Sequence, residues 1–582
     1  MKKSRNYIFS KEIDATSLIL NAASNLEEEK AIDKSESGLE LFIDQVLDKL
    51  EIKIDIVKSD LTRVPLTGAF IMVCNRPFGG METLAILKSL LSIRKDIKII
   101  GSFNINTLEP LKYAFFQTDF FQTGKYDTEG LKGVSKHLMD GKALIVFPAG
   151  NETEKYSFDW QKVDKKWNTV ALKLIKYAKV PVIPASFSGL DNIGFYLTGP
   201  LNTLLQKTLL RLDSKNNEGK TIKIRIGNAI SVTEQAEFSE VSRYGRYIRS
   251  KVYTLESQAE VKKYFTPLFH YPQKVEEIIA PIDQSAILNE INNLPSSCLL
   301  FKHTNYTVYC APHSYIPSIV MELGRLREQT FRDVGEGTNK KIDIDEYDLY
   351  YRHLFIWDNT KQCIVGSYRI GMGSEIMQKY GVKGFYVRSL FKLNKKMNPM
   401  LHEALELGRS FIVKDYQRNP VTLLLLWKGI LYFLLQNESY RYLFGPVSIS
   451  NNFSNISKAL ITGFFIKNHF DSEKAKWVKP RKMFKVNFSK VDTEIIHDKM
   501  PDMNSLDKII REIEPDNNRV PVLLKKYLQL GGKIVCFNID PKFNDALDGL
   551  MILDLYTIPN EQLKLLSKEL DIDVVGKRMN KK

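Results

Sequence analysis

The sequence has few cysteines and no long apolar stretch, and both absences narrow what the chain can be. Its 582 residues include five cysteines, which are scattered and form no CxxC pair. Disulfides and a zinc site are therefore not expected, and a reducing compartment is indicated. The longest apolar runs, Val421–Leu435 and Gly68–Cys74, are too short to span a bilayer, and no signal-peptide pattern opens the chain. We expect a protein that is cytoplasmic or peripheral to a membrane.

The sequence also lacks a nucleic-acid-binding motif, although it is basic. Its formal net charge is +15, but no helix-turn-helix, zinc-finger or RNA-recognition signature is present. The charge therefore predicts an anionic partner of another kind, such as an acidic protein or an anionic membrane surface. A nucleic acid partner is not expected.

The order of the predicted elements divides the chain into four parts. Strands and helices alternate from about residue 41 onward, which is typical of α/β sheets. We predict an N-terminal helical extension (1–40), a first α/β domain (41–235), a helical connector (236–300) and a second α/β domain (301–582). The predicted strands lie at residues 68–74, 97–102, 143–147, 181–186, 221–226, 306–311, 349–357, 364–371, 411–413, 442–444, 533–539 and 549–555. The predicted helices include residues 39–50, 81–93, 128–139, 168–177 and 421–435.

Three motifs of the first domain follow predicted strands. They are Asn75–Glu82 (NRPFGGME), Phe147–Glu152 (FPAGNE) and Val180–Pro184 (VPVIP). In this order and spacing they resemble the glycerolipid acyltransferase family, whose members make phosphatidic acid from lysophosphatidic acid. The resemblance covers about 41–235 and implies that Asn75, Phe147, Pro148 and Gly150 contribute to substrate binding, Gly150 through backbone N–H groups that can hold a phosphate. An ordinary turn after the strand is the alternative for Gly150.

The first motif departs from that family at its catalytic position. In the closest relatives it reads Asn-His-Pro-Phe-Gly-Gly-x-Asp, where the histidine takes the proton of the acceptor hydroxyl and the aspartate orients the histidine. Here Arg76 stands at the histidine position and Glu82 at the aspartate position. A guanidinium keeps its protons at every working pH, so it cannot be a general base. We expect an impaired O-acyltransferase domain or a binding scaffold, with an Arg76–Glu82 ion pair and a substitute base at His137 or Glu152 as alternatives.

The second domain holds a carboxylate and a guanidinium three residues apart. Glu406 and Arg409 precede a polar turn, 415–420, and then a long apolar helix. An amino group is protonated near pH 7, so its attack on a thioester needs a base or a desolvated site, and Glu406 is the best candidate for that base or for an amine anchor. Arg409, and second Arg369, can hold a substrate carboxylate through parallel N–H contacts. The alternative is that Glu406 and Arg409 pair with each other.

Further charged residues of this domain lie upstream. The acidic run 343–348 contains Asp343, Asp345 and Asp348, which could attract the side chain of a diamine such as ornithine, or could be a solvated loop. Arg327 and Arg332 precede it and are candidate substrate-binding residues.

Together with Val520–Leu524 and Phe537–Pro541, these residues resemble the N-acyltransferase branch of the acetyltransferase-like (GNAT-type) superfamily, which includes acyl-homoserine-lactone synthases. The resemblance covers about 285–560 and is strongest to the hemolysin-like enzymes that acylate the α-amine of ornithine. With the upstream domain, the chain is similar to bacterial bifunctional ornithine-lipid synthases. The resemblance implies transfer of a 3-hydroxyacyl chain from acyl carrier protein to the α-amine of an amino acid, without a metal or bound cofactor, and release of the lipid at the inner face of the cell membrane.

The resemblance also implies where the donor binds. The phosphate of a phosphopantetheine thioester would rest on 416–420, which includes Arg418, at the start of the apolar helix, because free N–H groups and the helix dipole favour an anion there. The usual glycine-rich loop is absent, which favours acyl carrier protein over coenzyme A. Basic residues suit that acidic partner: Arg388, Lys392, Lys395, Lys396, Lys414 and Arg418. Two other functions stay open, a lysophospholipid O-acyltransferase and a noncatalytic lipid- or acyl-carrier-binding scaffold.

Overall fold

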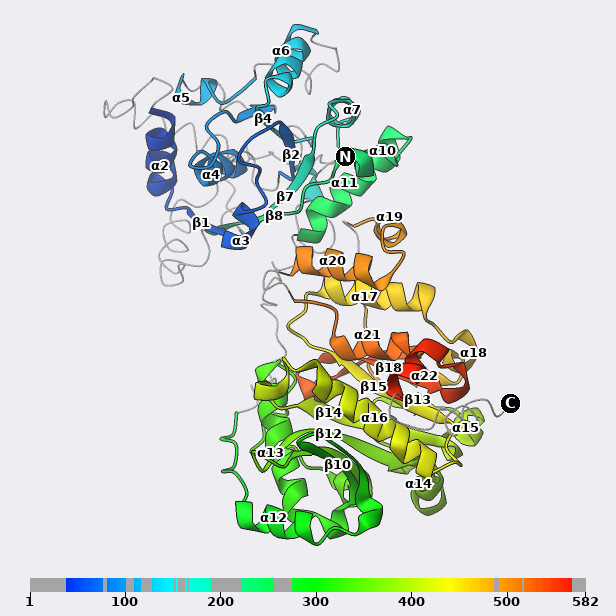
Figure 1. The fold of residues 1–582 in the computed structure, drawn as a ribbon. Coiled ribbons are helices and arrows are strands. Elements are labelled where there is room, and N and C mark those ends of the chain that lie inside the picture. The colour runs from blue at the N-terminus through cyan, green and yellow to red at the C-terminus, as the bar shows by residue number, and fades with distance from the viewer. Residues whose placement is uncertain are drawn as a thin grey trace, which may run out of the picture. The chain divides into compact units, whose positions relative to one another are not determined.

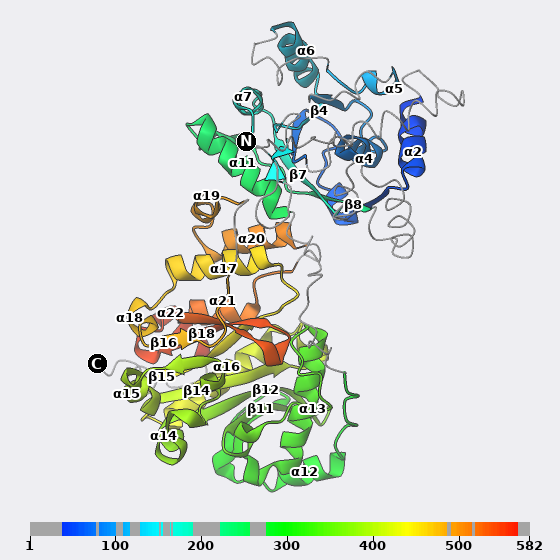
Figure 2. The same cartoon turned by 180° about the vertical axis from the view of Figure 1, so that it is seen from behind.

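The computed structural model of the chain forms two compact units (Figures 1 and 2). The first comprises residues 1–264, 488–501 and 511–517, and the second comprises 265–487, 502–510 and 518–582. The residues that the structure describes are 38–76, 81–100, 109–116, 128–149, 153–154, 163–164, 167–189, 221–255, 275–485, 491–514 and 518–567.

The first unit is built on a six-stranded sheet with the order β1-β8-β7-β2-β4-β3. The strands are β1 (Lys53–Ile56), β2 (Phe70–Cys74), β3 (Lys98–Ile100), β4 (Ala143–Val146), β7 (Val182–Ser188) and β8 (Thr221–Ile226), and a separate pair joins β5 (Thr153–Glu154) to β6 (Val163–Asp164). β7 and β8 are antiparallel, and the other neighbours in the sheet are parallel. Every residue of β2 is buried, because helices cover both faces of a parallel sheet and such strands are apolar throughout.

The helices of the first unit lie on the two faces of this sheet. They are α2 (Leu39–Lys49), α3 (Lys58–Leu61), α4 (Met81–Leu90), α5 (Glu109–Lys112), α6 (Thr128–Met139), α7 (Thr169–Tyr177), α10 (Val232–Ala236), α11 (Val241–Leu255) and α19 (Thr493–Asp498). The path β2–α4–β3 runs one way along the sheet, whereas β3–α6–β4 and β4–α7–β7 return, so right-handed connections place α4 on one face and α6 and α7 on the other. α2 packs on α4, and α11 packs on α7 and β7.

The segment predicted as a separate connector, 236–300, is divided between the units at residue 264. Its first part contains α11, which buries one apolar side that includes Tyr244, Ile248 and Val252. A helix with such a side must cover a core, and here it covers β7.

The second unit is built on an eight-stranded sheet with the order β17-β18-β15-β14-β12-β11-β10-β9. The strands are β9 (Leu299–His303), β10 (Tyr306–Pro312), β11 (Arg352–Asp358), β12 (Cys363–Met372), β14 (Ala404–Ile412), β15 (Tyr442–Ile449), β17 (Lys533–Asp540) and β18 (Ala546–Asp554), and β13 (Phe391–Leu393) pairs with β16 (Val478–Pro480). β14 and β15 are parallel, and the other neighbours in the sheet are antiparallel.

Helices cover this sheet as well. They are α12 (Gln284–Asn292), α13 (Pro317–Asp333), α14 (Gly373–Tyr380), α15 (Asn398–His402), α16 (Pro420–Gln436), α17 (Asn455–Asn468), α18 (Ser472–Ala475), α21 (Val522–Gln529), α22 (Asn560–Leu566) and α20 (Met503–Ile513), whose residues from 511 on belong to the first unit. α16 lies along one face, where Trp427 meets Tyr368 of β12 with 6.3 Å between ring centroids (Figure 1). Because side chains alternate along a strand, Arg369 lies on the opposite face.

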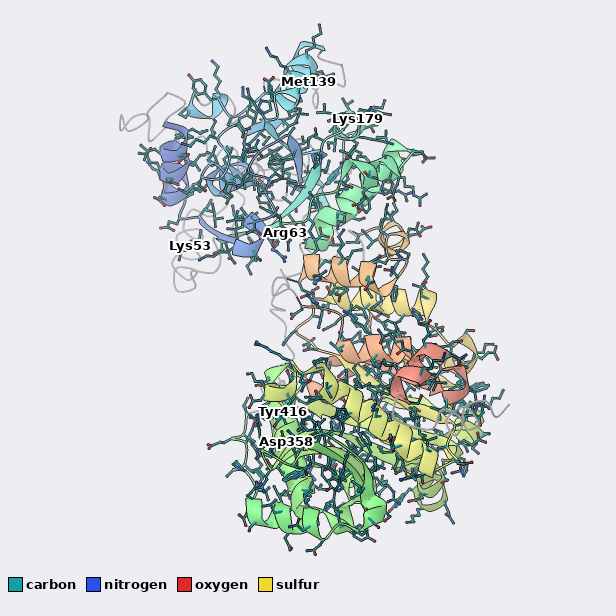
Figure 3. All side chains as sticks on the ribbon, in the orientation of Figure 1. Lys53, Arg63, Met139, Lys179, Asp358 and Tyr416 are labelled. Atoms are coloured by element: carbon teal, nitrogen blue, oxygen red, sulfur yellow. The ribbon has the colours of Figure 1, made fainter. Side chains whose placement is uncertain are left out.

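The turn between β14 and α16 is held to the β11–β12 hairpin. Tyr416 donates its O–H to Asp358 at 2.9 Å, and Figure 3 labels both residues. Asp358 also accepts the N–H groups of Thr360 and Lys361, at 2.9 and 3.0 Å. The start of α16 is thereby fixed relative to the sheet.

The predicted mixed α/β class is confirmed, with differences at two strands that matter for the site. The strand predicted at 349–357 begins at Arg352, because Glu346–Leu349 forms a 3₁₀ helix that Asp345 and Asp348 cap in a capping box. The strand predicted at 411–413 runs from Ala404 to Ile412. Its polar residues break the alternation by which strands are recognised. Among the described residues, no helix is both long enough and apolar enough to cross a bilayer.

Candidate functional site

The candidate site of the second unit lies where β14 and β15 separate. The two strands pair over three residues, Ala404–Glu406 opposite Tyr442–Phe444, and then continue without pairing to Ile412 and Ile449. Gly408 lies in the separated stretch, and a Cβ placed on it would meet no atom of the described residues within 4 Å. Unpaired strand edges present N–H and C=O groups, so this opening offers hydrogen bonds and room to an extended ligand.

A β-bulge turns Arg409 into this region. The pairing of β12 with β14 shifts between Ser367 and Arg369, and Arg409 has a φ of 50°. A bulge redirects a side chain that strand alternation would send to the other face. Arg409 therefore shares a face and a partner, Asp345, with Arg369.

A network of ion pairs occupies this face of the sheet. Its members are three arginines and three aspartates, Arg327, Arg369, Arg409, Asp343, Asp345 and Asp348. Arg369 Nη1 lies 2.5 Å from Asp345 and 3.2 Å from Asp348. Arg409 lies 2.8 Å from Asp343 through Nε and 3.3 Å from Asp345 through Nη2. The charges within this set balance.

Arg327 closes the network from α13. Its Nη1 donates to Asp348 at 2.9 Å, and its Nη2 donates to the backbone oxygen of Asp343 at 2.7 Å. Burial opposes the ionisation of Asp348, but Arg327 and Arg369 outweigh burial and hold the pKa of that carboxyl well below its usual range. Asp348 is 1% exposed and Asp343 is also buried, so the solvated-loop alternative is wrong for both.

Glu406 lies at the base of the separation and is 1% exposed. One carboxylate oxygen accepts the N–H of Val387 at 2.7 Å, and the other accepts the N–H of Tyr386 at 3.0 Å and the O–H of Tyr351. Burial raises the pKa of Glu406 to about 7, although these donors and Arg369 act in the opposite direction. A carboxyl with that pKa exchanges its proton near neutral pH. Among the contacts of the described residues, none joins Glu406 to Arg409, so the two do not form the ion pair that their spacing allowed.

Aromatic rings enclose the two arginines of the network. The Arg369 guanidinium lies 5.5 Å from the ring centroid of Tyr386, and that of Arg409 lies 4.9 Å from Tyr386 and 4.5 Å from Phe543. Rings at these distances attract a cation and exclude water from it. The network is thus both paired and shielded.

In the first unit, Asn75 of the motif that follows β2 joins two strands of the sheet. Asn75 donates to the backbone oxygen of Phe187 at 3.0 Å and accepts the N–H of Phe187 at 2.7 Å, which joins the end of β2 to β7. Arg76 and Glu82 are both buried, the second at the start of α4, while 77–80 lie outside the described residues.

The second motif of this unit also supports the core. Phe147 is buried against Phe187, with 6.3 Å between ring centroids, and the backbone oxygen of Pro148 accepts the N–H of Asn168, the cap of α7, at 2.8 Å. Gly150, predicted to bind a phosphate, and Glu152, an alternative site for a substitute base, lie outside the described residues.

His137 does not supply the base that Arg76 lacks. Its Nε2 lies 2.9 Å from the backbone oxygen of Ala143, which begins β4, whereas Arg76 follows the end of β2. Because β2 and β4 are parallel, His137 lies at the N-terminal ends of these strands and Arg76 lies at their C-terminal ends. Burial also lowers the pKa of His137.

Comparisons with known proteins find a family model that matches part of each unit. A family model described as acyltransferase matches residues 50–261, and one described as acetyltransferase (GNAT) domain matches 326–428. The chain is similar to two proteins named glycine N(alpha)-acyltransferase. The one from Phocaeicola vulgatus is 27% identical over 296 residues, 48% of this chain and 89% of the relative. The one from Bacteroides thetaiotaomicron is 26% identical over 292 residues, 48% of this chain and 86% of the relative.

The chain is an acyltransferase. It joins an acyltransferase domain to a GNAT-type domain, as the sequence predicted. The chain is also similar to the crystal structure of the 1-acyl-sn-glycerophosphate acyltransferase PlsC from Thermotoga maritima. The alignment covers 41% of the present chain and 91% of PlsC, at 16% identity and a TM-score of 0.27.

Arg332 and Arg418, both predicted to bind substrate, differ in their surroundings: Arg332 is held by hydrogen bonds, whereas Arg418 is exposed. Arg332 is a clamp within the second unit, since it donates to Glu328 at 2.6 Å and to the backbone oxygens of Glu276, at 2.7 Å, and Lys340. Arg418 is exposed at the turn before α16.

The sequence interpretation missed three acidic residues, of which two lie near Arg409 and the third lies near one of those two. They are Asp540 and Asp548, at the two sides of the β17–β18 hairpin, and Glu336, which follows α13. Asp548 interrupts the buried apolar stretch 546–553 of β18, and a buried-strand pattern with one acidic residue inside it is the signal that could have found it.

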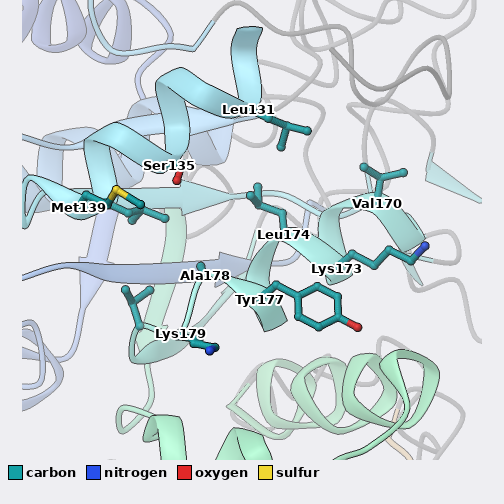
Figure 4. Close-up of a pocket in the computed structure, with 11 residues that line it drawn as sticks. Leu131, Ser135, Met139, Val170, Lys173, Leu174, Tyr177, Ala178 and Lys179 are labelled. Atoms are coloured by element: carbon teal, nitrogen blue, oxygen red, sulfur yellow. The ribbon is translucent and has the colours of Figure 1, made fainter. Parts of the chain in front are cut away.

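The acyltransferase also has an apolar groove in its first unit, between α6 and α7 (Figure 4). Its volume is about 710 Å³, and its lining includes Leu131, Leu138, Met139, Val170, Leu174 and Tyr177. Lys173 and Lys179 lie at its border.

Proposed function

We propose that this acyltransferase moves a 3-hydroxyacyl chain from a phosphopantetheine thioester to the α-amine of an amino acid, as a step of aminolipid synthesis. One observation carries the proposal. The opening between β14 and β15 at Gly408 adjoins buried Glu406 and the arginine network. The GNAT model spans 326–428 and so includes β14 and each member of that network.

The reaction needs one net proton acceptor. The ammonium of the amino acid loses a proton, its nitrogen attacks the thioester carbonyl, the C–N bond forms and the C–S bond breaks. The nitrogen then loses a second proton while the leaving thiolate gains one. Glu406, with a pKa of about 7, is suited to take the proton that is released.

Glycine is the acceptor that we propose first. Both relatives bear the name glycine N(alpha)-acyltransferase, and they are matched over 89% and 86% of their lengths. Ornithine, the acceptor of the enzymes that the second domain resembles, is the second acceptor to test.

Acyl carrier protein is the donor that we propose. Exposed basic residues near the start of α16 and around β13 support an acidic partner: Lys392, Lys395, Lys396, Lys414 and Arg418. Lys414 lies 3.5 Å from Asp333, an exposed pair that a partner can displace.

For the first unit, we propose a docking surface for an anionic membrane, from which the product leaves, and an impaired O-acyltransferase. Met139 is 84% exposed and Tyr177 is 65% exposed at the groove, beside Lys173 and Lys179. Exposed apolar side chains next to lysines suit the lipid–water interface. Arg76 supports the loss of base catalysis, because arginine does not deprotonate.

The test measures products of the purified full chain. It is supplied with 3-hydroxyacyl-acyl carrier protein or the coenzyme A thioester, and with glycine, ornithine or lysophosphatidic acid, and mass spectrometry reads the products. We expect N-acylglycine, made faster from the carrier-protein donor and reduced about 100-fold in Glu406→Gln, because an amide cannot accept the N–H groups at both of its ends.

Two controls separate the units. Glu403→Gln changes an exposed residue beside β14 and leaves N-acylation within twofold. We expect Arg76→His to leave N-acylation unchanged and to add O-acylation of the 3-hydroxyl group on the N-acyl chain. Phosphatidic acid without any N-acyl product from the unaltered chain would favour a lysophospholipid O-acyltransferase, and no acyl product at all would favour a binding scaffold.

A further inference from the structure

Three carboxylates gather beside Arg409 without a cation of their own in the network described above. Asp548 lies opposite Ser448 of β15 and Asn538 of β17 in the strand register, so these side chains share a face. Ser448 donates its O–H to Glu336 at 2.7 Å, which brings Glu336 to the same place. Asp540, two residues beyond Asn538, lies with its Oδ2 3.5 Å from the Tyr386 hydroxyl.

Asp548 is the member of this cluster that points to a ligand. Asp548 is 5% exposed, and among the described residues no donor forms a hydrogen bond or ion pair with its carboxylate. The charged groups that act on this carboxylate are Asp540, Glu336 and Arg409. A buried carboxylate normally has a hydrogen-bond donor, so this one is built to receive a donor from elsewhere.

The electrostatics of the cluster agree with a missing cation. Burial raises the pKa of Asp548 well above its usual range, and repulsion from Asp540 and Glu336 adds to the rise. Burial also raises the pKa of Asp540 and of Glu336. A bound cation would relieve this repulsion. An ammonium suits the cluster, because its N–H groups can donate to several oxygens at once.

We propose that Asp548 and Asp540, assisted by Glu336, bind the ammonium group of the amino acid acceptor. The inference rests on the proposed N-acyl transfer and names the part of the site that recognises the amine. Arg409 lies at the border of the cluster, so the two charges of a small zwitterion meet opposite charges there. The oxygens of Glu406 already accept hydrogen bonds from Val387, Tyr386 and Tyr351. Glu406 therefore accepts the released proton and does not bind the ammonium.

The test compares isosteric variants that remove one charge each. Asp548→Asn and Asp540→Asn probe the cluster, and Asp545→Asn is the matched control, because Asp545 lies in the same hairpin but pairs with Lys482 at 2.7 Å. The KM values for glycine and for the acyl donor are measured in the full chain. Thermal unfolding is measured with and without glycine, with N-acetylglycine, which keeps the carboxylate but has no ammonium, and with Mg²⁺.

We expect Asp548→Asn to raise the KM for glycine at least tenfold while the KM for the donor stays within twofold, and Asp545→Asn to change neither. Glycine should raise the Tm of the unaltered chain but not that of Asp548→Asn, and N-acetylglycine should raise neither. The Tm of Asp548→Asn without ligand should be equal or higher, because a repulsive charge is gone.

Other outcomes overturn the inference. An unchanged glycine KM in both cluster variants, or a Tm of the unaltered chain that rises with Mg²⁺ or N-acetylglycine as it does with glycine, excludes an ammonium site. A lower Tm of Asp548→Asn without ligand would assign the carboxylate a structural role. If the unaltered chain acylates no amine, the proposed function fails, and the thermal shift by glycine still decides whether the cluster binds an amino acid.

Discussion

The two units of this acyltransferase place their chemistry-bearing residues in different ways. In the first unit Asn75, Arg76 and Glu82 follow one another after the end of a single strand, β2. In the second unit Arg369, Glu406 and Asp548 come from the separate strands β12, β14 and β18. A contiguous motif depends on each of its few positions, so we expect Arg76 alone to remove its base. A site spread over a sheet depends on strand register, a bulge and the pairing of charges.

The arginine network gives the largest expected difference. Arg409→Met keeps most of the side-chain volume but leaves buried Asp343 and partly buried Asp345 without that cation. We expect a loss of about 3–5 kcal/mol of unfolding free energy, the usual effect of breaking a buried ion pair from one side. Urea denaturation of the full chain measures it.

Arg418→Met is the control, since Arg418 is exposed at the turn that follows. It should change stability by less than about 0.5 kcal/mol. Equal effects of the two substitutions would show that the network does not hold the second unit together.

Glu406 predicts a pH dependence. Its pKa is about 7 in the folded chain, against a usual value of 4.5, because burial favours the protonated form. The folded chain therefore binds this proton more tightly than the unfolded chain, and stability falls as pH rises from about 4.5 to 7. The shift corresponds to roughly 3 kcal/mol.

Glu406→Gln should flatten this part of the stability–pH curve, measured by urea denaturation at several pH values. Glu403→Gln, at an exposed position, should leave the slope as it is. A slope that survives in Glu406→Gln would place its origin in another group, such as Asp548.

Asn75 gives a smaller effect in the first unit. Asn75→Ala removes two hydrogen bonds to Phe187 and leaves buried backbone groups without them. We expect a loss of about 2 kcal/mol by thermal unfolding, with N-acylation unchanged. Asn228→Ala is the control, because Asn228 is a half-buried residue next to β8 whose side chain forms no hydrogen bond with the described residues. An Asn75→Ala variant that lost N-acylation while keeping its stability would show that the units are functionally coupled.

The smallest effect is expected at the groove. Met139→Ser combined with Tyr177→Ser should weaken binding to vesicles that contain anionic lipid several-fold in a sedimentation assay, with stability changed by less than about 0.5 kcal/mol. Leu41→Ser on α2, also exposed, is the control on the opposite face of the sheet. Binding that is lost equally in Leu41→Ser would remove the groove from consideration.

Local patterns made parts of this structure predictable. The helix predicted at 128–139 and the strand predicted at 221–226 have those bounds in the structure, because an amphipathic period and an apolar alternation define them. β14 was predicted too short, because Glu406, Gly408 and Arg409 interrupt its alternation. Those three residues surround the opening to β15, and a strand that serves a site gives up its regular pattern.

The sequence by itself determined the two α/β domains, the acyltransferase class and the presence of Arg76 at the histidine position of the first motif, because these depend on residue types at fixed spacing along the chain. Tertiary structure alone decided that Arg327, Arg369 and Arg409 pair with the acidic run and that Glu406 is buried with a raised pKa. It also decided that Asp548 meets no hydrogen-bond donor among the residues that the structure describes. Burial and the distance between charges depend on which strands become neighbours, and the order of residues does not state that.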